Sequence, residues 1–384
     1  MFGKIPLAWL QLTKEKSRLL AALAGITFAD ILMFMQLGFR DALFDSNTRM
    51  HKNLNADLVL ISSKSESLNS MQNFSQRRLY QTLGFPAVES VKPLYLGQLK
   101  WKNPVDRSDR LILVFGMKPN NPAFLMPEIK QNSHLIQIPD VVLFDRISRQ
   151  EFGPIAQMVE QGQSVSTEVG VRRIEVRGLF SMGASFAADG NLVTSDLNFI
   201  RLFPNRKLGE IDIGLIKLTP NSDPEIISKL IGQYLPNDVQ VFTKQEYIAY
   251  EKAYWQKRTA IGFVFRFGVI MGFIVGLVIV YQIIYTDVAD HLAEYATLKA
   301  MGYQDIYFFT LVIQQALLLA ILGYIPGIAC SLFLYTSARN ATMLPILMTI
   351  PRAVTVLGLT VLMCCVSGAI AMGKLQEADP ADIF

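Results

Sequence analysis

Residues 19–39 read LLAALAGITFADILMFMQLGF, an apolar run interrupted only by Asp30 and Gln36. A helix needs about 20 mostly apolar residues to cross the hydrocarbon core of a bilayer, so this run predicts a membrane span. Three further runs meet the requirement, at 261–285, 306–335 and 354–372. Residues 40–258 contain no such run. The sequence therefore predicts a membrane protein with four transmembrane helices and a large α+β domain inserted between helices 1 and 2.

The composition agrees with a membrane protein. Of the 384 residues, 51% are hydrophobic and only 18% are charged, with a mean hydropathy of +0.30. Soluble domains are closer to a quarter charged. The net charge of +4 is spread along the chain without a basic run that could follow a phosphate backbone. Nucleic acid is therefore not expected as a partner.

Basic residues before the first span set the expected orientation. Lys4, Lys14, Lys16 and Arg18 predict a cytoplasmic N-terminus. The run is longer than a signal-peptide core and no small-x-small cleavage site follows it, which favours an uncleaved anchor. The expected segments are then a cytoplasmic amphipathic helix (1–18), span 1 (19–39), a periplasmic domain (40–258), span 2 (259–285), a cytoplasmic helix (286–305), span 3 (306–335), a short periplasmic loop (336–353), span 4 (354–373) and a cytoplasmic tail (374–384).

The inserted region alternates strand-like and helix-like segments, which predicts an α+β domain of two lobes. Strands are expected at 57–61, 110–115, 141–144, 173–179 and 211–218. Helices are expected at 75–83 and 224–235, the second with Asp223 as its N-cap and proline at its first position. The polar segments 39–54 and 243–258 are expected to extend the first two spans as a helical stalk.

No catalytic, cofactor-binding or metal-binding residue is predicted. The chain has no G-x-x-x-x-G-K-[ST] loop for a nucleoside triphosphate. Its three histidines, His51, His134 and His291, are far apart and belong to no ligand pattern. Around Ser185, Gly183-Ala-Ser-Phe-Ala187 lacks the final glycine of a nucleophile elbow. Hydrolase activity is therefore not expected.

Glycines are spaced by four residues in two of the spans. Gly268, Gly272 and Gly276 lie on one face of the second span, and Gly323 and Gly327 repeat the spacing in the third. Such a face lets another helix approach closely. The partner could be a helix of the same chain or a second copy of it, and the sequence leaves both open.

Two charged residues fall inside the apolar runs. Asp30 lies near the middle of the first span and Arg266 lies just inside the second. An intramembrane carboxylate is costly and normally faces protein or water. Asp30 could pair with Arg266, or it could be protonated and hydrogen-bonded to a glutamine. Its role could be structural, or it could relay protons.

The stretch between the second and third spans predicts a short amphipathic helix with a glycine stop. Within it, residues 294–302 read EYATLKAMG. This motif resembles the E-I-x-x-L-K-A-L-G signature of the FtsX-like, MacB-type ABC transporter permeases. Two other segments resemble the same family, LAWLQL at 7–12 and DPAD at 379–382. Residues 25–40, GITFADILMFMQLGFR, resemble the DevC permeases of cyanobacterial DevBCA exporters.

The resemblance implies a coupling helix that docks into an ATPase, and the residues assigned to it are Asp290, Glu294, Leu298, Lys299, Met301 and Gly302. It implies a non-catalytic permease subunit of a tripartite exporter in the inner membrane, with ATP and magnesium bound by the partner. The implied partners are a DevA-like ABC ATPase, a DevB-like membrane-fusion adaptor, a TolC-type outer-membrane channel, membrane lipids and a second copy of the chain. Glycolipid is the implied cargo. The motif departs from the family in Tyr295 and in lacking the usual arginine before the glutamate, which favours a dedicated ATPase.

The same topology also fits two other functions. An FtsX-type signal transmitter would activate a periplasmic partner without moving cargo. A Lol-type permease would release lipoproteins to a carrier. A neighbouring gene for an adaptor would favour export, and one for a hydrolase would favour signalling.

Overall fold

The structure, a computed structural model, describes residues 7–376; the expected closing motif at 379–382 lies outside these residues. The chain divides into two compact units. The helical unit comprises the chain up to Asp41, residues 260–339 and the chain from Ile346, and the sheet domain comprises residues 42–259 and 340–345. Within residues 7–376, four helices are long and apolar enough to cross a membrane. They are α2 (Lys16–Lys52), α9 (Ala260–Asp290), α11 (Asp305–Thr342) and α12 (Ile350–Gln376). The predicted fold class is confirmed.

The helices extend beyond the predicted spans. Helix α2 continues without a break through Lys52, and α9 continues to Asp290. The expected loop at 336–353 is too long, because α11 ends only at Thr342 and α12 begins at Ile350. Thr336 illustrates why, since its hydroxyl donates to the carbonyl of Leu332 at 3.0 Å, one turn back in the helix. Polar residues of this kind end an apolar run without ending a helix.

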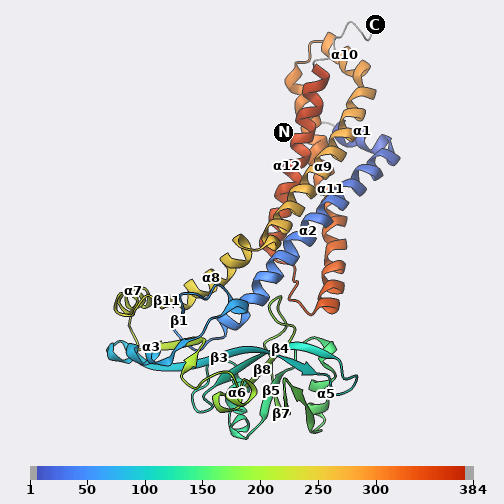
Figure 1. Cartoon of the computed structure of the whole chain (residues 1–384). Coiled ribbons are helices and arrows are strands. Elements are labelled where there is room, and N and C mark those ends of the chain that lie inside the picture. The colour runs from blue at the N-terminus through green and yellow to red at the C-terminus, as the bar shows by residue number, and fades with distance from the viewer. Residues whose placement is uncertain (1–6, 377–384) are drawn as a thin grey trace. The chain divides into compact units, whose positions relative to one another are not determined.

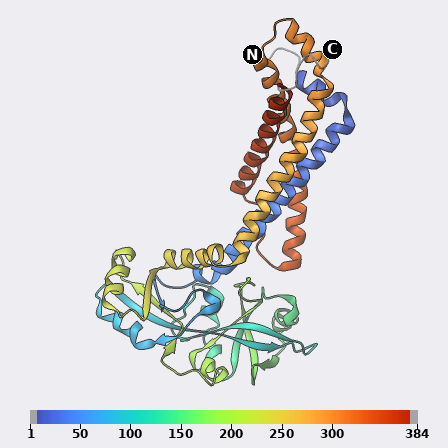
Figure 2. The same cartoon turned by 45° about the horizontal axis from the view of Figure 1, so that its top comes forward.

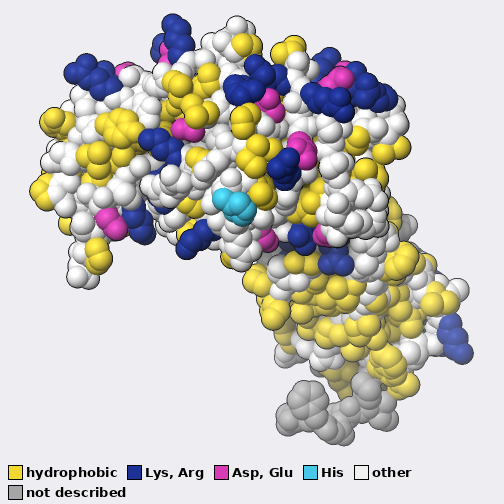
Figure 3. Space-filling model, turned by 90° about the horizontal axis from the view of Figure 1, so that it is seen from below, with side chains coloured by type: hydrophobic (Ala, Val, Ile, Leu, Met, Phe, Trp, Pro, Cys, Tyr) yellow, Lys and Arg dark blue, Asp and Glu magenta, His cyan; other side chains and the backbone are white. Residues whose placement is uncertain are grey.

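The helices of the helical unit pack around a shared apolar core. Its buried members come from all four long helices and include Ile26, Val280, Leu319 and Met363. Helices α9 and α12 lie side by side in both views (Figures 1 and 2). Hydrophobic side chains cover much of the visible surface of this unit, whereas charges of both signs are scattered over the sheet domain (Figure 3). An apolar outer surface of this kind suits contact with lipid.

The sheet domain contains a nine-stranded sheet in the order β11-β1-β10-β3-β4-β8-β5-β7-β6. The long strand β3 also pairs with β6, where Trp101 lies opposite Val169, so the strands from β3 round to β6 form a closed ring. The strands are β1 (Leu58–Ser62), β3 (Val88–Lys102), β4 (Asp109–Met117), β5 (Val141–Asp145), β6 (Val165–Val169), β7 (Arg172–Phe180), β8 (Asn191–Ser195), β10 (Ile213–Leu218), β11 (Val239–Thr243) and a separate pair, β2 (Phe74–Ser75) with β9 (Glu210–Ile211).

Short helices pack on this sheet and bury one apolar core, which includes Tyr95, Trp101 and Phe199. The predicted cap of α7 is confirmed, because the Asp223 side chain accepts hydrogen bonds from the backbone N–H groups of Glu225 and Ile226. The helices are α3 (Gln76–Gln81), α4 (Pro127–Gln131), α5 (Ile155–Glu160), α6 (Asp196–Leu202), α7 (Pro224–Tyr234) and α8 (Lys244–Lys257).

The C-terminal end of α2 contacts α8 within the sheet domain. The imidazole of His51 lies 3.6 Å from the Glu251 carboxylate, and its ring centroid is 4.5 Å from that of Tyr247. All three side chains are buried. Only two residues, Arg258 and Thr259, separate α8 from α9. The sheet domain is thus joined to the helical unit through helices at both of its ends.

Candidate coupling site

The expected amphipathic helix is α10 (Leu292–Ala300), which follows α9 after His291. Gly302 adopts a φ of +98°, the left-handed conformation that favours glycine. Its N–H donates to the carbonyl of Lys299, and the N–H of Tyr303 donates to that of Leu298. This is a Schellman motif, which satisfies the last carbonyls of the helix. The glycine therefore ends the helix, as the sequence indicates.

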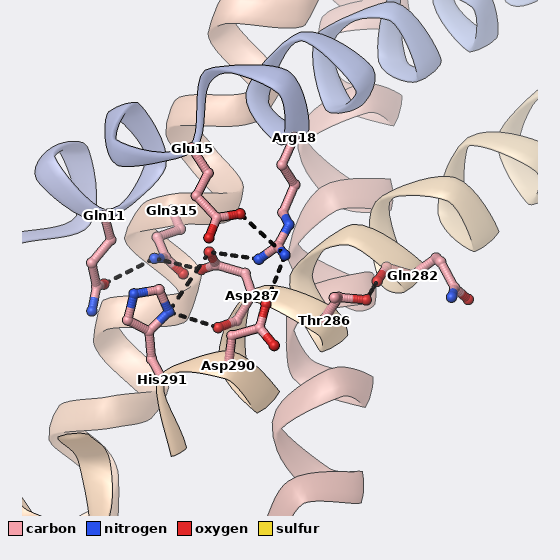
Figure 4. Close-up of polar contacts among 9 residues, drawn as sticks. All are labelled: Gln11, Glu15, Arg18, Gln282, Thr286, Asp287, Asp290, His291 and Gln315. Carbon is pink, nitrogen blue, oxygen red and sulfur yellow. Dashed lines mark hydrogen bonds and ion pairs between the residues drawn. The ribbon is translucent and has the colours of Figure 1, made fainter. Parts of the chain in front are cut away.

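A charged cluster joins the end of α9 to the start of α2 (Figure 4). Arg18, in the first turn of α2, donates to the Asp290 carboxylate at 2.6 Å. It also lies 3.8 Å from the Asp287 carboxylate and 3.1 Å from that of Glu15. The Asp287 side chain is only 9% exposed, whereas that of Asp290 is 50% exposed. Solvent weakens ion pairs at exposed positions, so they contribute little to stability. The contact with Asp287 is better shielded from solvent than the contact with Asp290.

Neutral side chains of α11 and α1 extend the charged cluster. The amide of Gln315, on α11, donates to the Asp287 carboxylate at 3.2 Å and to the Gln11 carbonyl oxygen at 3.0 Å. Gln11 belongs to α1 (Leu7–Lys14). The Nδ1 atom of His291 lies 2.8 Å from the backbone carbonyl of Asp287 (Figure 4). Asp287 of α9 therefore contacts α2 through Arg18 and α11 through Gln315, and Gln315 extends the network to Gln11 of α1.

One face of α10 is buried against the helical unit and the other is exposed. Tyr295 is 6% exposed and its ring centroid lies 5.3 Å from that of Phe308 on α11. Burial raises the pKa of Tyr295 to about 12. Leu298 packs against the same apolar core. Glu294 and Lys299, together with Met301 directly after the helix, are exposed.

Part of the helical unit is similar to a known protein family. Residues 266–378 match the model of the FtsX-like permease C-terminal family. The match includes most of α9, all of α10 and α11, and α12. None of the curated proteins matches the chain.

Solved structures similar to the chain cover about half of it. The periplasmic region of MacB from Actinobacillus actinomycetemcomitans is 11% identical, with a TM-score of 0.35, over 51% of this chain and 92% of that one. The extracellular domain of the ABC-type transporter YknZ from Gram-positive bacteria is 12% identical, with a TM-score of 0.32, over 48% and 99%. A domain of a permease protein from Porphyromonas gingivalis is 13% identical, with a TM-score of 0.31, over 50% and 88%.

The glycine face of α9 packs against helices of the same chain. A Cβ atom built on Gly268 would lie 2.4 Å from Gln36 of α2, and one on Gly276 would lie 2.2 Å from Met363 of α12. Gly272 likewise faces α2. In α11, Gly323 and Gly327 face α2 in the same way. Of the two partners that the spacing allows, the structure places a helix of the same chain against these glycines.

The pairing of Asp30 with Arg266 is wrong. Asp30 is fully buried and its carboxylate oxygen lies 2.5 Å from the Thr360 hydroxyl of α12. Arg266 is exposed on α9. Gln315, one of the glutamines considered as a partner, bonds to Asp287 instead. Spacing along the sequence could not reveal this, because it does not say which face of each helix is buried.

A second charged contact lies at the other end of the permease helices. Arg352, near the start of α12, donates to the Asp41 carboxylate of α2 at 2.7 Å and to the carbonyl of Leu347 at 2.6 Å. The Arg352 side chain is 5% exposed. Arg352 falls within 336–353, the segment expected as a short periplasmic loop, and the structure places it in α12 instead.

Four residues of the charged cluster at Asp287 have roles that were not predicted from the sequence, namely Gln11, Arg18, Asp287 and Gln315. The available signal was the position of Asp287 three residues before Asp290, which puts both carboxylates on one side of a helix.

Within residues 7–376, no group of three or more His, Cys, Asp and Glu side chains is placed to hold a metal ion.

Proposed function

We propose that this chain is the membrane subunit of a MacB-type ABC exporter, which couples a separate cytoplasmic ATPase to movement of its extracytoplasmic domain. The observation that supports this most directly is the attachment of α10. Its buried face, through Tyr295, and the adjoining Asp287 cluster fix it to the permease helices, while Glu294 and Met301 remain exposed. A helix held in this way can receive a force from outside the chain and pass it on.

The connections of α10 define the proposed path. Helix α9 leads from α10 back to α8 with only Arg258 and Thr259 between them, and α2 runs from the Arg18 contact through to Lys52. Both helices therefore connect the charged cluster to the sheet domain along the chain. Because a helix resists compression and bending along its length, displacement at one end is transmitted to the other.

The resemblance of the chain to DevC-type permeases extends the proposal. The ATPase is DevA-like and binds ATP and magnesium itself, so that this chain is non-catalytic and binds no cofactor. The chain works as a homodimer in the inner membrane with both termini cytoplasmic. The sheet domain meets a DevB-like adaptor and a TolC-type channel, and the cargo is a glycolipid-like molecule taken from the periplasm or the outer leaflet.

The test is the activity of the complex reconstituted in lipid with its ATPase. Reversing the charge of exposed Glu294 with Glu294→Arg should abolish ATPase binding to the permease and its stimulation by adaptor. Glu225→Arg, in the first turn of α7 in the sheet domain, is the matched control and should preserve both. Equal ATPase binding by the two variants would contradict docking at α10.

Cargo assays separate export from the two other functions. Adaptor-dependent release of lipid supports the proposed exporter. Activation of a periplasmic hydrolase without cargo would indicate an FtsX-type transmitter, and transfer of lipoprotein to a carrier would indicate a Lol-type permease.

A further inference from the structure

The middle of the helical unit contains a buried carboxyl group without a cation. Asp30 is 0% exposed, and its Oδ1 atom lies 2.5 Å from Oγ1 of Thr360. Its Oδ2 atom is buried and has no hydrogen-bond partner. No ion pair of the described residues includes Asp30, and Arg266 is exposed on another helix. A carboxylate buried with a single hydrogen bond and no counter-charge is strongly unfavourable.

The contacts of the Thr360 hydroxyl also argue against a charged Asp30. Its hydroxyl has one hydrogen, yet Oγ1 lies 2.8 Å from the Val356 carbonyl as well as 2.5 Å from Asp30. A carbonyl oxygen can only accept. If the Thr360 hydrogen is donated to Val356, the hydrogen between Thr360 and Asp30 must belong to the carboxyl group. A protonated Asp30 satisfies both contacts and also removes the buried charge.

We propose that Asp30 is a neutral carboxylic acid in the folded protein and donates its hydrogen to Thr360, joining α2 to α12 in the middle of the membrane. The inference does not depend on the proposed function. Asp30 is then a positioning residue for α2.

The neighbouring side chains fit a neutral acid at this position. On α11, a Cβ atom at Gly327 would lie 2.9 Å from the Asp30 Cβ atom, so glycine lets this helix close over the carboxyl group. Tyr324 of α11 donates its hydroxyl to the Ala353 carbonyl instead. Cys364 of α12 is a buried free thiol. Among the described residues, none bonds to the Oδ2 atom of Asp30.

Infrared spectroscopy of the purified full-length chain at neutral pH tests the protonation state. The wild-type minus Asp30→Asn spectrum should contain the C=O stretch of a protonated carboxyl group. Asp45→Asn is the matched control, because Asp45 lies on the same helix, is exposed and pairs with Lys52 at 3.0 Å. That difference spectrum should contain carboxylate bands. Carboxylate bands in the Asp30→Asn difference spectrum would overturn the proposal.

Thermal unfolding of the full-length chain in detergent tests the hydrogen bond between Asp30 and Thr360. Asparagine has an N–H that can donate to Thr360, so Asp30→Asn should unfold within about a degree of the wild type, whereas Asp30→Leu should unfold several degrees lower. Thr360→Val should lower the midpoint in the wild type but add little to Asp30→Leu. A loss in Asp30→Asn as large as that in Asp30→Leu would overturn the donor role. Additive losses in the double variant would overturn the pairing.

Discussion

Substituting Gly276 by alanine tests whether the glycine face of α9 packs within one chain. The added Cβ atom would lie 2.2 Å from Sδ of Met363 and 2.7 Å from Cβ of Ala29. The methionine side chain can rotate away, but the Ala29 Cβ atom is fixed to the backbone of α2. The two helices must therefore separate by several tenths of an ångström. Overpacking of this kind costs about 1–3 kcal/mol, more than the up to about 1 kcal/mol that replacing a helical glycine by alanine gains.

The assay is reversible unfolding of the purified chain in detergent, at protein concentrations low enough to prevent self-association. Gly358→Ala is the matched control, because this glycine of α12 has no atom within 4 Å of its built Cβ position. We expect Gly276→Ala to be less stable than the wild type by about 1–2 kcal/mol and Gly358→Ala to be equally or slightly more stable. If Gly276→Ala retains wild-type stability and loses only dimer formation, the glycine face packs between two copies of the chain and not within one.

Three other contacts give smaller effects. Arg18→Met should lower the unfolding free energy by about 1 kcal/mol, a difference that shrinks in high salt because the arginine is partly exposed. Asp223→Ala should lower it by about 1 kcal/mol through loss of the α7 cap, measured by chemical denaturation. The pKa of Tyr295 is raised from its ordinary 10.0 to about 12, so its neutral phenol stabilises the fold below pH 10.0 and this contribution is lost as the pH rises through 12. Tyrosinate absorbance compared with Tyr295→Phe should show this delayed ionisation.

The spans and several strands were predictable because their apolar residues are consecutive or alternate. The prediction of 141–144 corresponds closely to β5, which is buried along its whole length. The longest strand, β3, was missed. It contains Pro93 and Gly97, which normally argue against a strand. In the fold, the Phe203 ring lies against Gly97, where a Cβ atom would be only 2.5 Å from it, so tertiary packing explains the glycine.

Helix α10 was predictable as an element but its attachment was not. Its glycine stop and its exposed Glu294 follow from the local sequence. Arg18 and Asp290, in contrast, are 272 residues apart, and Gln11 and Gln315 are 304 residues apart. No local pattern encodes such pairs. Asp41 and Arg352 show the same limit, because each reads in the sequence as an ordinary charge beside a span.

We propose that ATPase docking at α10 moves the sheet domain through α9 and α8. Hydrogen–deuterium exchange of the reconstituted permease–ATPase complex tests it most directly, with the amides of α8 (244–257) followed with and without nucleotide. We expect nucleotide to change exchange in α8 in the wild type and in Glu225→Arg. In Glu294→Arg, exchange in α8 should not respond. An α8 that does not respond in the wild type, or that responds equally in Glu294→Arg, would contradict the account.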